Sequence, residues 1–256
     1  ARHSTSLYLW VSAGGAAGAF FVGVLAPVAF SANYELFWAL ISVSALAVVV
    51  SWKHGVAWSA GWSIATVAIA IWLMDQARVD RRGTIAQVRS FYGTLRVTES
   101  PRSGSGVTAR TLYNGTIEHG VQLYGSGQRL VPNTYYADSS GIGIALDFCC
   151  TGPRHVGVIG LGTGTLAAYG RRGDVFRFYE IDPLVERIAR DLFTYLNESD
   201  ASVSVVLGDA RVSLTAESSQ QFDVLAVDAF SGDAIPVHLL TAEAIALYRR
   251  HLKPDG

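Results

Sequence analysis

Two acids in one loop are the strongest sign of chemistry in this sequence. Asp228 ends the apolar stretch Phe222–Val227, and Asp233 follows a few residues later. An alkylamine has a pKa of about 10 and is mostly protonated at neutral pH, so its attack on an alkyl donor needs a base. A carboxylate can bind the ammonium and accept its proton. The pattern predicts Asp228 as the catalytic residue of a group transfer to an amine, and a helix cap or turn is the alternative for both acids.

A glycine-rich loop, Gly160-Leu-Gly-Thr-Gly164, follows the short apolar stretch His155–Ile159. Glycines between a strand and a helix let a ligand approach the backbone and its N–H groups. Glu180 ends the next apolar stretch, where a carboxylate accepts both ribose hydroxyls. Asp209 follows the third stretch, where it can accept from an adenine amino group. A dinucleotide site needs only the first acid, so this order favours an S-adenosyl nucleoside over NAD.

The elements that would position these residues alternate between strand and helix patterns. We expect strands at 155–159, 176–180, 202–207 and 222–227, and helices at 135–150, 166–169, 183–193 and 241–252. Asp182 and Pro183 suit the first positions of the third of these helices. This alternation predicts an α/β fold, a Rossmann-like, mostly parallel sheet that binds ligands at the carboxyl ends of its strands.

A different pattern precedes this region. Strand patterns cover 89–98, 107–113 and 116–124, and Asn114-Gly115 between the last two is a strong hairpin signal. We therefore expect a small β-hairpin module in front of the parallel sheet.

Charge is distributed unevenly along the 256 residues, of which 50% are hydrophobic and 16% charged. Only Arg2, Glu35 and Lys53 of the charged residues fall before Asp75. The runs 7–30, 36–52 and 55–74 are uncharged and close to the length that crosses a bilayer. We expect three transmembrane helices, the first of them kinked at Pro27.

Positive residues set the expected orientation. Arg78, Arg81, Arg82 and Arg89 follow the third run, which the positive-inside rule places in the cytoplasm. The expected location is the inner cell membrane, multi-pass, with the catalytic domain facing the cytoplasm and the lipid bilayer as a partner. The net charge of −1 indicates no nucleic-acid partner. The chain begins with Ala and stops at Pro254-Asp255-Gly256, so we expect parts of the protein beyond both ends.

Together the motifs resemble the spermidine synthase (polyamine aminopropyltransferase) family, in particular its bacterial members fused to membrane helices. The matching segments are Asn114-Gly115, Thr134–Asp138, Val158–Thr165, Tyr179–Pro183, Leu207–Ala210 and Phe222–Phe230. The resemblance implies a methyltransferase-like α/β domain behind the β-hairpin module. On this basis we divide the chain into a transmembrane segment (1–82), the β-hairpin module (83–132) and an S-adenosyl-nucleoside-binding α/β domain (133–256) that is C-terminally incomplete.

The resemblance also implies a reaction and a set of roles. The donor would be S-adenosylmethionine or its decarboxylated form, the acceptor an amine such as putrescine and the by-product methylthioadenosine, with no metal and with a homodimer as an open option. Glu180 would hold the ribose, Asp209 the adenine, and Asp228 would be the base. The full donor-binding set is Gly160, Gly162, Thr163, Gly164, Glu180, Asp182, Asp209 and Ala210. The substrate-binding set is Gln122, Tyr136, Asp138 and Asp233.

Two departures from the family pattern keep alternatives open. Thr163 stands where synthases of this family usually have an acid that grips the propylamine of the donor, and the hairpin has Asn114 in place of an Asp. Intact S-adenosylmethionine or another acceptor therefore stays open, with Glu118, His119 and Asp138 as further polar groups. The competing functions are an S-adenosylmethionine-dependent methyltransferase and a membrane transport or sensor protein whose nucleoside-binding domain does not catalyse.

Overall fold

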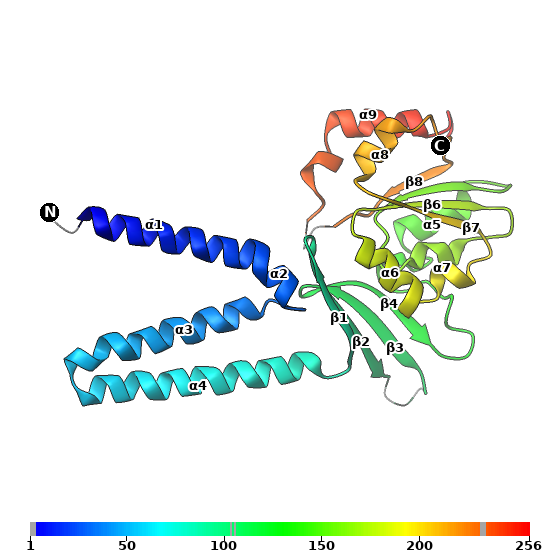
Figure 1. Cartoon of the computed structure of the whole chain (residues 1–256). Helices are drawn as coiled ribbons and strands as arrows, with labels where there is room; N and C mark the ends of the chain where they lie inside the picture. Colours follow the sequence, from blue (N-terminus) through cyan, green and yellow to red (C-terminus); the bar gives the residue numbers. More distant parts are fainter. Residues whose placement is uncertain (1–3, 103, 105, 231–233) are drawn as a thin grey trace. The chain divides into compact units, whose positions relative to one another are not determined.

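The computed structural model describes residues 4–102, 104, 106–230 and 234–256. The chain divides into two compact units, Ala1–Thr94 and Leu95–Gly256, with the division inside a strand (Figure 1). The first unit carries the apolar helices, and the second carries the α/β region with all the candidate site residues.

Three helical segments of the first unit are long and apolar enough to cross a membrane, as the sequence predicts. They are Thr5–Ala29, Tyr34–His54 and Val56–Arg81. The elements within them are α1 (Ser4–Phe20), a π-helical turn (Phe21–Leu25), α2 (Ala26–Ala29), α3 (Tyr34–Ser51), a 3-10 turn (Trp52–His54) and α4 (Val56–Arg81). The π-helical turn ends two residues before Pro27, which has no N–H to continue the regular hydrogen-bond pattern. Large apolar side chains along these helices are exposed, which suits a lipid environment.

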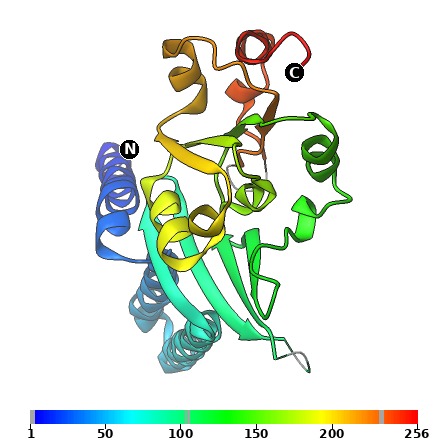
Figure 2. The same ribbon diagram turned by 90° about the vertical axis from the view of Figure 1, so that its right-hand side faces the viewer.

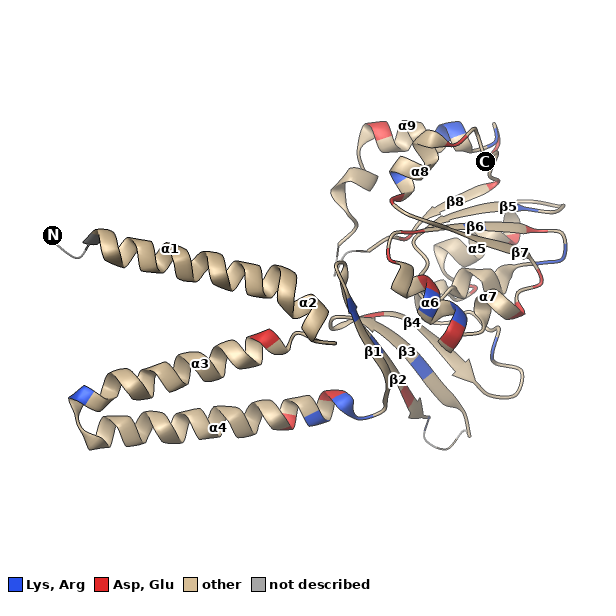
Figure 3. Ribbon diagram, in the orientation of Figure 1, with Lys and Arg blue, Asp and Glu red and all other residues tan. Residues whose placement is uncertain are grey.

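The helices extend beyond the uncharged runs at their ends. In these apolar helices the charged residues lie near the helix ends. Most charged residues of the chain lie outside these helices (Figure 3). Glu35, which the sequence places outside a run, lies in the first turn of α3 and forms a two-pronged ion pair with Arg89, at 2.8 and 2.9 Å. Each of these side chains is 11% exposed. Each charge would be costly at this degree of burial without its counter-charge.

Four strands form a sheet in chain order, β1 (Thr84–Ser90), β2 (Gly93–Pro101), β3 (Thr108–Asn114) and β4 (Ile117–Tyr124). The pairs β2–β3 and β3–β4 are antiparallel, and Asn114 and Ile117 flank the predicted hairpin turn. The expected single strand at 89–98 is wrong. The Ser90 hydroxyl accepts from the Tyr92 N–H, and Gly93 has φ +149°, so the chain turns between β1 and β2 although the alternating pattern runs on.

The α/β region has the predicted parallel sheet, in the order β7-β6-β5-β8. Its strands are β5 (His155–Ile159), β6 (Val175–Glu180), β7 (Ser202–Leu207) and β8 (Val224–Val227). Since β5 comes first in the chain, the strand order reverses between β5 and β8, and this switch point is where such sheets bind ligands. The sheet contributes Ile159 and Tyr179 to a buried cluster that also holds residues of α8 and α9.

Helices cover both faces of this sheet. They are α5 (Gly141–Phe148), α6 (Pro183–Leu192), α7 (Tyr195–Glu198), α8 (Ala210–Ala216) and α9 (Ala242–His251), with 3-10 turns at Thr134–Tyr136, Thr165–Tyr169 and Val237–Leu239. Figures 1 and 2 show α8 and α9 side by side on one face, with α6 and α7 on the other. The helices expected at 183–193 and 241–252 are therefore confirmed to within a residue at each end.

One helix prediction is wrong in extent and another in helix type. The helix expected at 135–150 begins only at Gly141, because the Ser140 hydroxyl accepts from the Gly143 N–H and caps it. The helix expected after the glycine loop is a single 3-10 turn. At its end a Cβ on Gly170 would lie 2.4 Å from Ser199 Oγ, so a close approach of chain segments stops it there. As a result, Tyr136 lies in the 3-10 turn before α5 and not in an α-helix, and no α-helix begins directly after the glycine loop.

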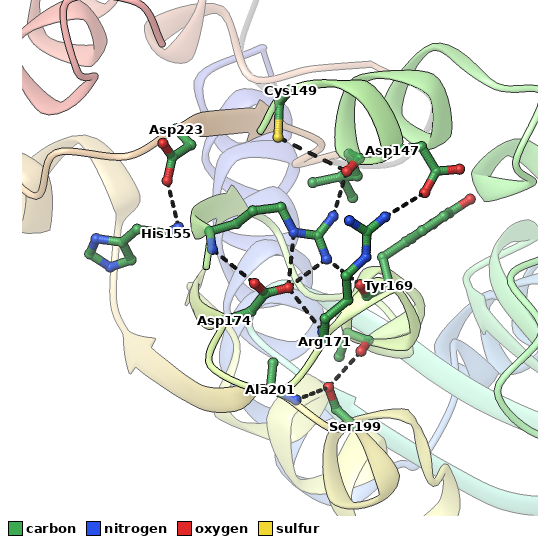
Figure 4. Close-up of polar contacts among 12 residues, drawn as sticks. Asp147, Cys149, His155, Tyr169, Arg171, Asp174, Ser199, Ala201 and Asp223 are labelled. Carbon is green, nitrogen blue, oxygen red and sulfur yellow. Dashed lines mark hydrogen bonds and ion pairs between the residues drawn. The ribbon is translucent and has the colours of Figure 1, made fainter. Parts of the chain in front are cut away.

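A buried ion pair joins several of these elements beneath the site. Arg154 and Asp174 are each 1% exposed, and Arg154 Nη2 lies 2.5 Å from Asp174 Oδ2 (Figure 4). The guanidinium also donates to the carbonyls of Leu146 in α5 and Tyr169 in the 3-10 turn. Burial alone would raise the pKa of Asp174, but the bonds from Arg154 and from the Arg171 N–H outweigh it and lower the pKa. The charged pair therefore ties α5, the turn and β6 together.

Asp174→Asn should destabilise this region by about 3 to 5 kcal/mol, because it leaves Arg154 buried without its counter-charge. Hydrogen exchange of the full chain in detergent should report faster exchange in 141–180. Asp147→Asn is the matched control, since Asp147 pairs with Arg171 at the surface and is 43% exposed; it should cost less than about 1 kcal/mol. Equal protection in the two variants would contradict a structural role for the buried pair.

Candidate active site

Backbone contacts bring the glycine loop and the end of β8 together. The Asp228 N–H donates to the Ile159 carbonyl at 2.8 Å, directly before the loop. Gly160 has φ +99°, and a Cβ there would lie 2.5 Å from the carbonyl oxygen of Asp228. The packing of the protein therefore requires a glycine at position 160, whether or not a ligand binds there. The contact fixes where the catalytic candidate leaves the sheet, at the switch point between β5 and β8.

The carboxylate of Asp228 is held by Tyr136. The Tyr136 hydroxyl donates to Asp228 Oδ2 at 2.6 Å, linking the segment before α5 to the end of β8. Burial raises the pKa of Asp228, and the Tyr136 hydrogen bond opposes that rise. Burial and the nearby Asp228 charge raise the pKa of Tyr136, so the phenol stays a neutral donor. A buried carboxylate with a raised pKa is a better proton acceptor than one in water.

Tyr169 holds Tyr136 and Asp138 in turn. Its hydroxyl donates to the Tyr136 carbonyl at 2.5 Å and lies 3.1 Å from Asp138 Oδ1. The structure therefore places two of the four predicted substrate-binding residues, Tyr136 and Asp138, near one another through Tyr169. Sequence reasoning assigned no role to Tyr169, which it expected only as a residue of a helix.

Tyr135 links the segment before α5 to Glu118 of β4. Tyr135 packs edge-on against Tyr136 at 5.1 Å, and its hydroxyl donates to the Glu118 carbonyl at 2.5 Å. Burial raises the pKa of Tyr135, and the charges of Glu118 and Asp228 both add to that rise. The Tyr135 hydroxyl therefore lies within the electrostatic influence of both acids.

Glu180 joins the glycine loop to the end of β6. Its two carboxylate oxygens accept from the Leu161 N–H at 3.0 Å and from the Asp182 N–H at 2.9 Å. The residue is 8% exposed, and burial raises its pKa although these backbone bonds oppose the rise. A carboxylate has about four lone-pair sites, so capacity for ribose hydroxyls remains after the two backbone bonds.

The other acids of the donor set cap helices. Asp182 accepts from the Leu184 N–H and is 3% exposed. Asp209 accepts from the Val212 N–H through Oδ1, and Oδ2 lies 2.8 Å from Nε2 of His238. Ala210 is buried in the core beside α9. Both acids therefore cap helices, the alternative role for an acid at these positions. Asp209 is the more exposed of the two. No pattern in the sequence marked His238.

Several predicted ligand contacts are turned towards the protein instead. A Cβ on Gly162 would lie 2.9 Å from the His119 carbonyl, and one on Gly164 would lie 2.7 Å from Leu196. Thr163 is 1% exposed, and its hydroxyl lies 2.8 Å from that of Thr165. These positions pack the loop on β4 and α7, so Gly162 and Gly164 are required by packing within the protein, and their contact with a ligand stays a prediction.

The side chain of Gln122 is held by hydrogen bonds within the protein. Its side chain is fully buried, and its amide donates to the Arg129 carbonyl and the Thr194 hydroxyl. Its oxygen accepts from the Thr194 N–H and the Tyr124 hydroxyl. These bonds use the two amide hydrogens and both acceptor sites of Gln122, so the side chain supports the packing of β4, and its contact with a substrate stays a prediction. Asp233 lies outside the described residues.

His119 is a polar group that the sequence analysis left without a role. Its Nε2 is buried with no hydrogen-bond partner within the described part of the chain. Burial lowers the pKa of His119, which favours the neutral imidazole. His119 lies in β4, and its carbonyl lies against Gly162 of the glycine loop.

No family model matches the chain. A polyamine aminopropyltransferase of Vibrio vulnificus (strain CMCP6) is 31% identical over 111 residues, which are 41% of this chain and 36% of that protein. A probable polyamine aminopropyl transferase of Bifidobacterium longum (strain NCC 2705) is 26% identical over 155 residues, 57% of this chain and 32% of that protein. The chain therefore spans about a third of the length of these two relatives.

Two further proteins show other likenesses. An N-terminal histidine N-methyltransferase of Emericella nidulans is 36% identical over 104 residues, 39% of this chain and 18% of that protein. The crystal structure of a probable spermidine synthase from Corynebacterium glutamicum ATCC 13032 aligns with a TM-score of 0.48 and 16% identity, over 67% of this chain and 60% of that one. The names of these proteins say nothing of membrane helices. The sequence relatives confirm the predicted resemblance, in that parts of this chain are similar to proteins named polyamine aminopropyltransferase.

Proposed function

We propose that this protein is a membrane-tethered aminopropyltransferase, which moves an aminopropyl-type group from an S-adenosyl donor to an amine such as putrescine. The observation that carries the proposal is the buried Asp228 carboxylate, hydrogen-bonded to Tyr136 and fixed beside the glycine loop. The relatives named polyamine aminopropyltransferase support the reaction class. The donor is S-adenosylmethionine or its decarboxylated form.

In this reaction the amine nitrogen attacks the alkyl carbon next to the sulfonium. The new C–N bond forms as the C–S bond breaks, and methylthioadenosine leaves with the electron pair on sulfur. Asp228 accepts the proton that the ammonium loses, and Tyr136 keeps the carboxylate oriented towards the nitrogen. Glu118 adds negative charge for a cationic acceptor, while Glu180 and Asp209 hold the ribose and adenine. Positioning of donor and acceptor supplies much of the remaining rate, since the sulfonium is already a good leaving group.

Asp228→Asn should reduce turnover by about 100-fold to 10,000-fold, because the amide cannot accept the proton. The measurement is methylthioadenosine released from donor and putrescine by the full chain in detergent. Binding of methylthioadenosine should be retained, and Asp200→Asn, at an exposed position, should behave as the wild type. Wild-type turnover in the Asp228 variant would refute the base role.

The pH dependence gives a second test. Only the ionised Asp228 can act as the base, so kcat/KM should fall as the pH drops through its raised pKa. Tyr136→Phe removes the bond that lowers this pKa, so the acidic limb of the profile should move to higher pH, with a loss of about tenfold in rate. Tyr135→Phe is the control, because its hydroxyl binds the Glu118 carbonyl, and its limb should stay in place. An unmoved limb in Tyr136→Phe would contradict the proposed coupling.

A methyltransferase is the second candidate, favoured by the likeness to the histidine N-methyltransferase. The two functions differ in which sulfonium bond breaks. An aminopropyltransferase releases methylthioadenosine, and a methyltransferase releases S-adenosylhomocysteine, so identification of the nucleoside product by mass spectrometry separates them.

We also propose that the three apolar helices anchor the protein in the inner membrane with the catalytic region in the cytoplasm. The arginines that follow the third span support this orientation.

Cys149 is exposed and serves as a native probe of the orientation. A membrane-impermeant maleimide should label it in inverted vesicles and not in spheroplasts. Lys53→Cys in a Cys149→Ser, Cys150→Ser background lies one span away and should label oppositely. The reverse pattern would overturn the orientation.

A further inference from the structure

The contact between Asp209 and His238 is a feature that the reaction proposed above does not use. Asp209 follows β7, and His238 lies in the 3-10 turn Val237–Leu239 between β8 and α9. Nε2 of His238 lies 2.8 Å from Oδ2 of Asp209. The side chains are 48% and 26% exposed, respectively. The pair therefore stands at the surface near the carboxyl end of the sheet, where the adenine of an S-adenosyl ligand is expected.

The backbone of this turn is held at His238 and at Leu239. Its carbonyl accepts from Nη1 of Arg211 at 2.9 Å, which joins the turn to the first residues of α8. Leu239 is 3% exposed, and its carbonyl accepts from the Tyr248 hydroxyl at 3.0 Å. These contacts hold the backbone of the turn, from which the His238 side chain reaches Asp209. The pairing is thus built into the packing of α8 and α9.

The two bonds to Asp209 set the orientation of its carboxylate. The Val212 N–H occupies one site on Oδ1, and the imidazole N–H occupies one site on Oδ2. With a donor on each oxygen, the plane of the carboxylate is defined, and its remaining lone pairs point in fixed directions. Those lone pairs can accept from an exocyclic amino group but repel a carbonyl oxygen. A fixed acceptor of this kind discriminates between bases by the cost of leaving it unpaired.

We propose that His238 is a positioning residue for nucleobase recognition, which orients Asp209 so that the site selects a 6-amino purine over a 6-oxo purine. The inference rests on the proposed function in one respect, namely that the ligand is an S-adenosyl nucleoside. It assigns no part of the transfer chemistry to His238. Its effect falls on the affinity and base selectivity of the site.

Calorimetric titration of the full chain in detergent with methylthioadenosine and with methylthioinosine tests this role. The wild type should prefer methylthioadenosine. His238→Ala should lose about tenfold in affinity for methylthioadenosine and change little towards methylthioinosine, so the selectivity falls by the same factor. His238→Gln carries an amide N–H that can replace the imidazole donor, and it should recover most of the selectivity. Val237→Ala, at a side chain 80% exposed in the same turn, is the matched control and should keep wild-type selectivity.

The outcomes separate this inference from the proposed function. Unchanged selectivity in His238→Ala, equal weakening for both nucleosides, or no recovery by His238→Gln would each overturn the inference and leave the transfer reaction standing. Selectivity that depends on His238 in a protein that transfers no alkyl group would support the inference and overturn the proposed reaction. A wild type that binds neither nucleoside would overturn both.

Discussion

The candidate site depends on one close approach, between Gly160 and the backbone of Asp228. The two strands that meet there, β5 and β8, are neighbours in the sheet but lie far apart in the sequence. Only a residue without a Cβ allows the loop after β5 to pass the end of β8 at this distance. This constraint fixes the point at which Asp228 leaves the sheet. Tyr136 then reaches its carboxylate from a third segment, and the electrostatic character of the acid follows from that contact and from burial.

The region around this approach is supported from within the protein more than sequence reasoning expects. Glycines that suggest open space for a ligand serve largely to pack the loop on β4 and α7. Glu180 holds the loop through two backbone N–H groups. The buried Arg154–Asp174 pair connects the elements below it. A site assembled this way is positioned before a ligand arrives, which is the arrangement that transfer by in-line displacement requires.

The sequence predicted the parts of the fold that local patterns determine. Apolar runs gave the three long helices, strand–helix alternation gave the parallel sheet, and Asn114-Gly115 gave the hairpin. It failed where a tertiary contact or a single side chain overrides a pattern, as at Gly93 between β1 and β2 and at the Ser140 cap. The site shows the same division. Asp228, Tyr136 and Asp138 come together, while Gln122 is taken up by hydrogen bonds within the protein and His238 lies in an apolar stretch with no motif to mark it.

The most direct measurement is an experimental structure of the full chain with methylthioadenosine bound. The account predicts the ribose hydroxyls on Glu180, the adenine amino group on Asp209 beside His238, and the thioether sulfur on the side of Asp228. A nucleoside bound elsewhere, or an Asp228 carboxylate facing away from the sulfur, would contradict the account.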